Sequence, residues 1–466
     1  MNERMDPAPK ARRAPRLAGR SWVPSGSEAL IADLALQCAA IDFAAIDLAI
    51  HDLAEESRQI HDVECVNLNP ATNVMNPRAE ALLSSGIGTR PSLGYPGDKY
   101  EMGLEAIEQI EVLAAELVAE VFDAPYVEIR VASGAMANLY AFLAAAEPGD
   151  AIIVPPAGIG GHVTHNTAGA AGLRGLVIHE APTDDLRYTI DVDRLRAMAH
   201  EVRPKMITVG SSLNLCHHPV REIREIADEV GAAVLFDAAH LSGLIAGGAW
   251  PNPLHEGAHM MTMSTYKSLG GPPSGVIVTN DAALAERLDA IAYPGLTANF
   301  DVAKSAALAI TMLDWLAHGS DYASTMVANA RTLALALADR NLPVVRSATG
   351  ATESHAFALN MASYGGGHTV ARGLRRSNVL TSAIGLPFDD GAGLRVGTTE
   401  ITRWGAMPDD MSSLADLIAR AFTDNPESVA ADVTEWRSRF TEIHYTREGI
   451  VPGGSADRRG SAEPVG

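Results

Sequence analysis

Short apolar runs alternate with amphipathic stretches through the middle of the chain. The stretches carry apolar residues three and four positions apart, which is typical of helices packed against a core. The predicted strands are Tyr126–Val131, Ala151–Val154, Leu176–Ile178, Met206–Val209, Ala233–Phe236, Met260–Met263 and Val276–Thr279. The predicted helices are Leu104–Phe122, Ala135–Ala146, Val192–His200, Val220–Val230 and Ala282–Ile291. Such alternation predicts an α/β fold in which helices cover a mainly parallel, mixed sheet.

The two ends of the chain follow other patterns. From about Gly26 to Arg58 the apolar spacing is helical, whereas residues 66–103 are rich in Pro, Asn and Gly and predict a long loop, a type of segment that is usually functional. Shorter strands and helices mix in the C-terminal part, which predicts a smaller α/β domain. The expected divisions are a disordered leader (1–25), an N-terminal helical arm (26–70), a large domain (71–310), a small C-terminal domain (311–446) and a disordered tail (447–466).

Composition narrows the class of protein. The 466 residues are 47% hydrophobic and 20% charged, as in a compact soluble enzyme. A formal charge of -21 disfavours nucleic acids and anionic membranes as partners, and no apolar run reaches transmembrane length. Three scattered cysteines are too few for a disulfide framework or a zinc site, which favours a reducing compartment. We therefore expect a cytoplasmic enzyme that uses no metal.

An acid and a lysine follow two neighbouring predicted strands. Asp237 comes directly after Phe236, and Lys267 follows the next apolar run, just before a Gly-Gly-Pro turn. Of the five lysines in the chain, only Lys267 stands at a strand exit beside glycines. A carboxylate can keep a pyridine nitrogen protonated, and a lysine can form a Schiff base with an aldehyde. The pair therefore indicates pyridoxal phosphate (PLP) as the cofactor.

Other polar residues fall at the same edge of the predicted sheet. Ser133-Gly134-Ala135 opens a helix and suits a phosphate group, although Ser133 also fits an ordinary helix cap. His162 follows two glycines after a strand and can stack on an aromatic ring, and Ser212 follows the strand that ends at Val209. Because open α/β sheets bind ligands beyond the carboxyl ends of their strands, this convergence predicts a binding site.

Two further groups of residues differ in what they predict: the first indicates a binding residue, and the second does not indicate a site. Arg395 leaves a glycine turn and enters an apolar run, where a guanidinium can bind a substrate carboxylate through two hydrogen bonds. Cys216-His217-His218 is a single local cluster without distant partners, so it does not predict a metal site.

A series of motifs in fixed order resembles the serine hydroxymethyltransferase family, PLP-dependent transferases of fold type I, from roughly Leu68 to Gly405. The motifs are Gly94-Tyr95-Pro96-Gly97, Ser133-Gly134, Gly160-Gly161-His162-Val163-Thr164-His165, Asp237-Ala238-Ala239-His240, Thr265-Tyr266-Lys267 and Leu394-Arg395-Val396-Gly397-Thr398. The resemblance implies a large PLP-binding domain with a mainly parallel mixed sheet and a smaller C-terminal α/β domain. It also implies a homodimer or homotetramer whose subunits share active sites.

The resemblance assigns roles to individual residues. Lys267 would be the Schiff-base lysine, Asp237 the partner of the pyridinium nitrogen, and His162 would stack on the ring. The other cofactor-binding residues would be Ser133, Gly134 and Ala135 at the phosphate, Ser212 and His240 near the phenolic oxygen, and Thr265 beside the lysine. The residues that bind the amino acid substrate would be Arg395, Tyr95 and Tyr100.

The chain departs from the family pattern where folate chemistry takes place. The family has a tyrosine and a glutamate just before Gly-Tyr-Pro-Gly, and this chain has Pro91 and Leu93. The glutamate is the acid/base of the folate-dependent step, and a leucine can neither donate nor accept a proton. A family serine aligns with Ala71, and the histidine before the lysine is Tyr266. The cofactor-binding residues are thus kept while the folate-step residues are replaced.

These observations predict an enzyme that makes or breaks the Cα–Cβ bond of a β-hydroxy-α-amino acid, as an aldolase or transaldolase acting through a glycine quinonoid without folate. Its substrates would be an amino acid and an aldehyde. The proton-transfer residue stays open among His162, His165, Glu101 and water. Alternatives are a tetrahydrofolate-dependent hydroxymethyltransferase, another PLP reaction such as transamination or decarboxylation, and a PLP-binding scaffold. The presence of both Lys267 and Arg395 argues against a scaffold.

Overall fold

The computed structural model describes residues 14–387 and 389–447, and the chain divides into two compact units between Cys65 and Val66. Most of the predicted leader (1–25) and tail (447–466) lies outside the described residues. Within the described residues, no helix is both long and apolar enough to cross a membrane.

The first unit consists of α1 (Ser25–Ala40), α2 (Phe43–Arg58) and the short helix η1 (Gln59–Glu64). The predicted helical arm is broken at Asp42, whose carboxylate accepts a hydrogen bond from the Ala45 N–H (2.8 Å) and caps α2. No residue of α1 or α2 is buried. Large apolar side chains are exposed along both helices: Leu30, Leu34, Leu36, Phe43, Leu48, Ile50 and Leu53.

The second unit is built on a sheet that has seven strands among the described residues. Its strands are β4 (Tyr126–Val131), β5 (Ala151–Val154), β6 (Val177–Glu180), β9 (Met206–Val209), β10 (Ala233–Asp237), β11 (Met260–Ser264) and β12 (Gly275–Thr279), in the spatial order β4-β12-β11-β10-β9-β5-β6. Only β12 runs against its neighbours. The prediction of a mainly parallel, mixed sheet is therefore confirmed, and six carboxyl ends share one edge.

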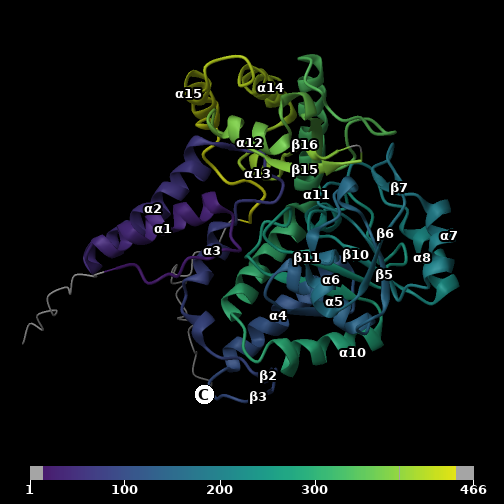
Figure 1. Ribbon diagram of the computed structural model, residues 1–466. Coiled ribbons are helices and arrows are strands. Elements are labelled where there is room, and N and C mark those ends of the chain that lie inside the picture. The colour runs from purple at the N-terminus through teal and green to yellow at the C-terminus, as the bar shows by residue number, and fades with distance from the viewer. Residues whose placement is uncertain (1–13, 388, 448–466) are drawn as a thin grey trace, which may run out of the picture. The chain divides into compact units, whose positions relative to one another are not determined.

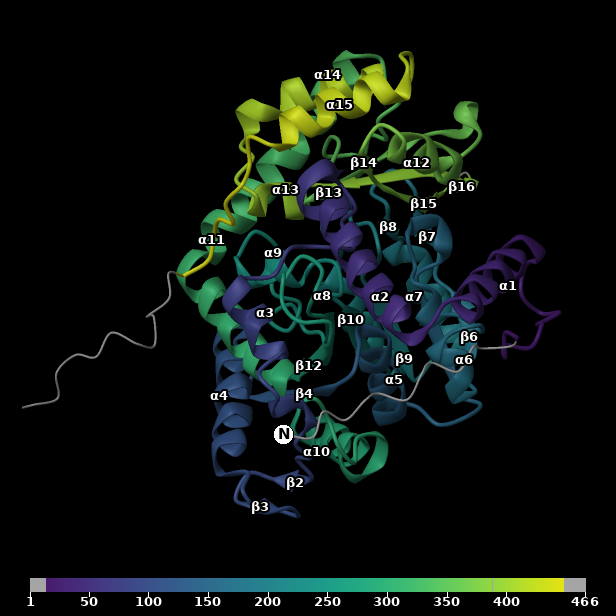
Figure 2. The same ribbon diagram turned by 90° about the vertical axis from the view of Figure 1, so that its left-hand side faces the viewer.

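Helices cover both faces of this sheet (Figures 1 and 2). They include α4 (Glu105–Phe122), α5 (Gly134–Ala145), α6 (Ala170–Arg174), α7 (Val192–Val202), α8 (Val220–Val230), α9 (Ser242–Ala246) and α10 (Ala282–Ala290). Alternate residues of β10 enter two different cores, as the period of a strand requires. Val234 and Phe236 belong to one buried cluster with residues of α4 and α8, whereas Leu235 belongs to another with residues of α5 and α10. The central strand is thereby held from both sides.

A smaller part of the same unit follows the long helix α11 (Val302–Asp339). It contains the antiparallel sheet β13 (Ala356–Asn360), β16 (Asp389–Gly397) and β15 (Ser382–Leu386), with α12 (Gly367–Arg375), α13 (Thr399–Arg403), α14 (Met411–Arg420) and α15 (Pro426–Arg437) around it (Figure 1). The expected domain boundary at residue 310 falls inside α11. The helix packs against α3 and α4 near one end and against α14 near the other.

Short elements complete the second unit. The strands are β1 (Val66–Asn67), β2 (Gly94–Tyr95), β3 (Asp98–Lys99), β7 (Thr183–Asp184), β8 (Thr189–Ile190) and β14 (Val379–Leu380). The helices are α3 (Pro77–Leu83), η2 (Ile87–Thr89), η3 (Ala157–Ile159), η4 (Val163–His165), η5 (Ile291–Leu296), η6 (Ala362–Tyr364) and η7 (Pro408–Asp410). The predicted long loop 66–103 thus contains only short elements around its irregular stretches.

Gly210, directly after β9, is a position at the sheet edge where both backbone conformation and close packing require glycine. Its φ of +90° is left-handed, and a Cβ atom there would collide with the carbonyl oxygen of Asp237. We expect Gly210→Ala to lower the free energy of unfolding by at least ~3 kcal/mol, since β9 and β10 would have to separate. The measurement is urea denaturation followed by circular dichroism.

Gly231 offers the matched control for this substitution. It also has a positive φ, +72°, but no atom lies within 4 Å of a Cβ built on it. Gly231→Ala should cost only about 1–2 kcal/mol, the conformational penalty alone. Equal losses of unfolding free energy in the two variants would show that the contact with Asp237 does not restrict Gly210.

Candidate active site

A small cavity opens where the carboxyl ends of the large sheet meet the small sheet. Its lining residues come from the segments that follow β4, β5, β9, β10 and β11: Gly134, Ala135, Asn138, His162, Ser211, Ser212, Asp237, Ala239, His240, Ser264 and Lys267. A larger hollow along the edge strand β4 is lined in part by Arg130, whose guanidinium is paired with Glu128 and Asp289. Because the charged groups of the larger hollow are already paired with one another, the small cavity is the better candidate for an active site.

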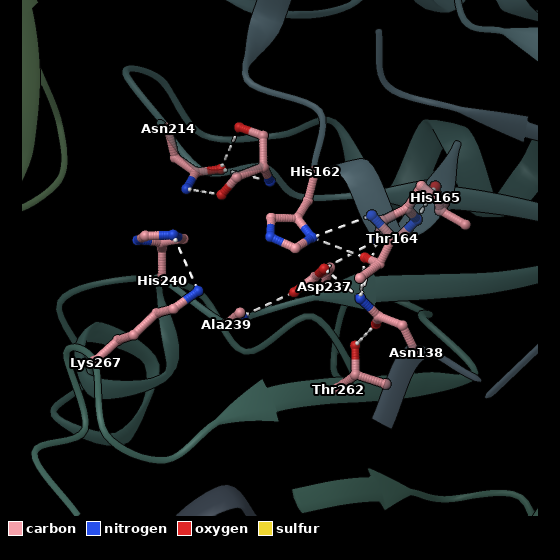
Figure 3. A network of polar contacts seen from close by, with 12 residues as sticks. Asn138, His162, Thr164, His165, Asn214, Asp237, Ala239, His240, Thr262 and Lys267 are labelled. Carbon is pink, nitrogen blue, oxygen red and sulfur yellow. Dashed lines mark hydrogen bonds and ion pairs between the residues drawn. The ribbon is translucent and has the colours of Figure 1, made fainter. Parts of the chain in front are cut away.

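Asp237 ends β10 and is 6% exposed. Its Oδ2 accepts a hydrogen bond from Asn138 Nδ2 (2.9 Å) and lies 2.9 Å from His165 Nε2, while Oδ1 accepts from the Ala239 N–H (3.0 Å). Burial opposes ionisation of this carboxyl, but these contacts outweigh burial and hold the pKa of Asp237 well below its ordinary range. The cavity therefore contains a fixed negative charge (Figure 3).

The partners of Asp237 are themselves oriented by hydroxyl groups. Thr262 donates to Asn138 Oδ1 (2.7 Å), which leaves the amide nitrogen of Asn138 directed at the carboxylate. His165 Nδ1 lies 3.1 Å from Thr208 Oγ1. Because an ionised carboxylate only accepts hydrogen bonds, His165 carries its proton on Nε2, and its Nδ1 accepts from Thr208. Both ring nitrogens of His165 are thus engaged, one by Asp237 and the other by Thr208.

Lys267 stands in a loop that Thr265 closes after β11. The Thr265 carbonyl accepts from the Gly271 N–H (2.7 Å), and its hydroxyl accepts from the Ser274 N–H (3.1 Å). Lys267 is 7% exposed, and this burial lowers the pKa of its amine to about 8, although the charge of Asp237 acts in the opposite direction. A large fraction of the amine is therefore neutral at mildly alkaline pH.

His240 lies between two cations. Its Nε2 is 3.3 Å from Lys267 Nζ and 3.4 Å from Arg395 Nη1. Burial, together with those two charges, lowers the pKa of His240 well below its ordinary value, so the imidazole is neutral. With Nε2 accepting, the proton sits on Nδ1, which has no hydrogen-bond partner among the described residues. A buried donor without a partner suits a ligand oxygen.

Arg395 belongs to the small sheet and reaches the large-sheet edge from β16. Its Nε donates to Ser382 Oγ (3.1 Å), and its Nη1 donates to the carbonyl of Ser212 (2.6 Å). Burial lowers the pKa of the guanidinium to about 10, which still leaves it a cation at neutral pH. The cavity edge therefore carries a buried positive charge that suits a carboxylate.

The residues predicted for the phosphate have a different local role in the structure. Ser133 caps α5 by accepting from the Met136 N–H (3.2 Å), the simpler reading of this motif. Gly134 and Ala135 line the cavity, and a Cβ on Gly134 would collide with Ser264. The N-terminus of α5 therefore approaches β11 closely and directs its positive end at the cavity. Phosphate binding by these residues stays a prediction that this geometry fits.

His162 lines the cavity and is partly buried. Its Nδ1 lies 2.8 Å from Thr164 Oγ1, and burial lowers the pKa of the imidazole from its ordinary value. Figure 3 shows His162, His240 and Lys267 around Asp237. The structure thus brings together a neutral imidazole, a lysine of lowered pKa and a carboxylate, and PLP sites use such a lysine and such an acid.

Seven predicted residues do not line this cavity: four adjoin or contact residues that do (Ser133, His165, Thr265 and Arg395), and the other three are Tyr95, Tyr100 and Glu101. Tyr95 donates to Asp289 Oδ2 (2.7 Å) and lines the larger hollow, and Tyr100 is 79% exposed. Glu101 is partly buried, and its Oε2 lacks a hydrogen-bond partner among the described residues. Their roles as substrate-binding and catalytic residues stay predictions.

Sequence reasoning missed Asn138, which contacts Asp237 directly. The signal was a lone amide on the apolar side of the predicted helix Ala135–Ala146, where a buried polar group needs a partner. The hydroxyls of Thr208 and Thr262 left no such signal, because threonine is common in strands.

Comparisons with known proteins show the family of this chain. The serine hydroxymethyltransferase family model matches residues 43–418. An α-methylserine aldolase from Variovorax paradoxus is 58% identical over 436 residues, which cover 93% of this chain and 99% of that protein. A second one, from a Ralstonia species, is 55% identical over 437 residues, covering 92% of this chain and 100% of that protein.

More distant relatives share the same framework. A serine hydroxymethyltransferase from Methanocella arvoryzae is 38% identical over 385 residues, covering 81% of this chain and 91% of that protein. The crystal structure of L-threonine transaldolase from Pseudomonas fluorescens in its internal aldimine state matches this chain with a TM-score of 0.80 at 23% sequence identity. The match covers 86% of this chain and 94% of that one, and it shows the same fold. The chain therefore belongs to the serine hydroxymethyltransferase family of PLP-dependent fold type I enzymes, and it makes or breaks the Cα–Cβ bond of a β-hydroxy-α-amino acid.

Proposed function

We propose that this enzyme cleaves and forms α-methylserine as an aldolase that needs no folate. The observation that carries the proposal is the 55–58% identity, over more than nine-tenths of both chains, to α-methylserine aldolases. Leu93 supports it, because this residue stands where the folate-dependent family has its glutamate. A tetrahydrofolate-dependent hydroxymethyltransferase is the second candidate, supported by relatives at 38% identity.

The proposed reaction balances without a further co-reactant. The hydroxyl of α-methylserine loses its proton, the Cα–Cβ bond breaks, formaldehyde leaves, and Cα gains a proton to give alanine. PLP supplies an electron sink for the electron pair left at Cα. It would be held by Lys267, Asp237, His162 and the N-terminus of α5, whose geometry and charges fit it. The same residues run the reverse reaction.

Arg395 would bind the carboxylate of the substrate. Two of its nitrogens are fixed by Ser382 and the Ser212 carbonyl, so the guanidinium is held in place before substrate arrives. Its charge survives burial, since its pKa remains at about 10. A fixed carboxylate then determines which bond at Cα is presented for cleavage.

His162 is the predicted base that best fits removal of the hydroxyl proton. Its lowered pKa keeps the imidazole unprotonated at neutral pH, and it lines the cavity. His165 is engaged on both ring nitrogens, so we assign it the orientation of Asp237 instead of proton transfer. Lys267, with its lowered pKa, would return a proton to Cα.

We further propose that the enzyme works as a homodimer or homotetramer in the cytoplasm. Tyr95, Tyr100 and Glu101 do not line the cavity of their own chain, and a second copy would bring them to a shared site. The exposed apolar side chains of α1 and α2 would also be covered in such an assembly. The three scattered cysteines support a reducing compartment.

Lys267→Ala should abolish both the visible absorbance of bound PLP and all turnover, because it removes the amine that holds the cofactor. The measurement is an absorption spectrum of the purified variant together with formaldehyde release from α-methylserine. Lys205→Ala is the control, since that lysine is exposed at the far end of the sheet, before β9. Turnover in Lys267→Ala at the wild-type rate would refute the site.

Cleavage of α-methylserine should release formaldehyde and alanine in equal amounts at a rate that tetrahydrofolate changes less than about twofold, since no acid stands at position 93. The measurement is product release with and without the folate. Leu93→Glu tests whether the missing acid accounts for this independence: tetrahydrofolate-dependent serine cleavage that appears only in this variant would show that it does. Serine cleavage by the wild type that depends on folate would establish the hydroxymethyltransferase and contradict the proposal.

PLP uptake by the apo-protein should follow the titration of Lys267. The neutral amine is the nucleophile, so the uptake rate should rise about tenfold per pH unit below its pKa of about 8 and level off above it. The measurement is the rate at which visible absorbance grows between pH 6 and pH 10. An uptake rate that still rises tenfold per pH unit between pH 9 and pH 10 would contradict the lowered pKa.

A further inference from the structure

A chain of four buried side chains leads from β8 to the loop that follows β9. Its members are Thr189, His218, Asn214 and Ser211, none more than 7% exposed. Thr189 Oγ1 lies 2.7 Å from His218 Nδ1, and His218 Nε2 lies 2.7 Å from Asn214 Oδ1. Asn214 Nδ2 donates to the Ser211 carbonyl (2.9 Å), and Asn214 Oδ1 accepts from the Ser211 N–H (3.2 Å). Figure 3 labels Asn214, one member of this series, near the cavity residues drawn there.

The hydrogen-bond pattern fixes the proton positions along the chain. Asn214 must present its oxygen to the Ser211 N–H and its nitrogen to the Ser211 carbonyl, so the amide has a single orientation. His218 Nε2 then donates to that oxygen, and His218 Nδ1 accepts from the Thr189 hydroxyl. A neutral histidine is required, and burial lowers the pKa of His218 to about 4. Every donor and acceptor on the ring is satisfied.

This series of hydrogen bonds reaches the site through Ser212, the residue after Ser211. The Ser212 carbonyl accepts from Arg395 Nη1 (2.6 Å), and the Ser212 N–H donates to the Gly160 carbonyl (2.7 Å). Gly160 begins the turn that carries His162. The backbone of one residue, Ser212, therefore connects the segment of His162 with the guanidinium of Arg395, and Asn214 fixes the turn that contains it.

We propose that His218 is a positioning residue for binding of the substrate carboxylate: through Asn214 it holds the Ser211–Ser212 turn, whose carbonyl orients Arg395. The inference rests on the carboxylate-binding role proposed for Arg395. His218 lies outside the cavity and touches no reacting atom. Its contribution is to keep the Ser212 carbonyl at one place, so that Arg395 meets the carboxylate without first reorganising.

A histidine that only fills space would behave differently. His218 also packs edge-on against Phe236, with 5.9 Å between ring centroids, and at 6.1 Å from Trp250, so its loss affects packing as well. A packing role would be served by any side chain of similar volume. The proposed role needs a donor toward Asn214 and an acceptor toward Thr189, which glutamine supplies and leucine does not.

The test compares His218→Ala, His218→Leu and His218→Gln in the PLP-loaded enzyme. Alanine binding is measured by calorimetric titration, and α-methylserine cleavage is measured in parallel. We expect the alanine Kd and the KM to rise about tenfold in the first two variants, with kcat changed less than about threefold, and glutamine to recover most of the loss. Binding of alaninamide, which lacks the carboxylate, should change little.

The neighbouring His217 provides the matched control. It is exposed and contacts Trp250 and Glu353 at the surface, so His217→Ala should bind alanine like the wild type. If His218→Ala does not fold, Thr189→Val keeps the shape and removes only the hydroxyl that donates to His218, and it should give a smaller rise in the same constants. Unchanged alanine binding in the folded variants would overturn the proposal.

A double-mutant cycle separates this inference from the proposed function. In an Arg395→Lys background, His218→Ala should cause no further loss of alanine binding, because the group that it positions is already gone. Wild-type alanine binding by Arg395→Lys would refute the role of Arg395 itself. Additive losses of alanine binding in the double variant would refute the positioning role of His218 while leaving Arg395 as the carboxylate-binding residue. If the wild type binds glycine or serine but not alanine, the proposed substrate is wrong and the cycle is run with that amino acid.

Discussion

The buried negative charge of Asp237 is the constraint on which the rest of the site depends. An isolated carboxylate in a protein interior would cost several kcal/mol or would take up a proton. Here its ionised form is stabilised by Asn138, His165 and the Ala239 N–H, which come from three different segments. The threonines that orient these partners stand on β9 and β11, on either side of β10. Ionisation of one side chain thereby requires the assembled sheet.

The cations on the other side of the cavity complement that charge. Lys267 and Arg395 both approach His240, which must stay neutral because a third positive charge in a buried space would be costly. Two buried cations near one imidazole are electrostatically unfavourable in the absence of an anion. A phosphate-bearing cofactor and an amino acid carboxylate would both relieve this excess. The apo-site therefore favours anionic ligands before any specific contact forms.

Much of this arrangement could be read from the sequence, because buried strands and amphipathic helices leave strong periodic signals. All seven strands of the large sheet were predicted, and their bounds differ by at most two residues. The break at Asp42 and the uninterrupted course of α11 were not predicted, since one depends on a single cap and the other on tertiary packing. The positions of Tyr95 and Glu101 relative to the cavity could not be predicted, because spacing within a loop does not fix its path. His218 was set aside as part of a weak metal motif, because its partners lie on segments far apart in the chain.

The continuous helix α11 limits how the two parts of the second unit can move. Thirty-eight residues without a proline form a rod of about 57 Å, which resists bending. Trp315, midway along it, donates to the Leu269 carbonyl (2.8 Å) in the loop that carries Lys267. A rotation of the small sheet that moved α11 would therefore also displace the loop that carries Lys267. Local movement of side chains and loops would therefore admit a ligand with less disturbance of Lys267 than a rotation of the small sheet would cause.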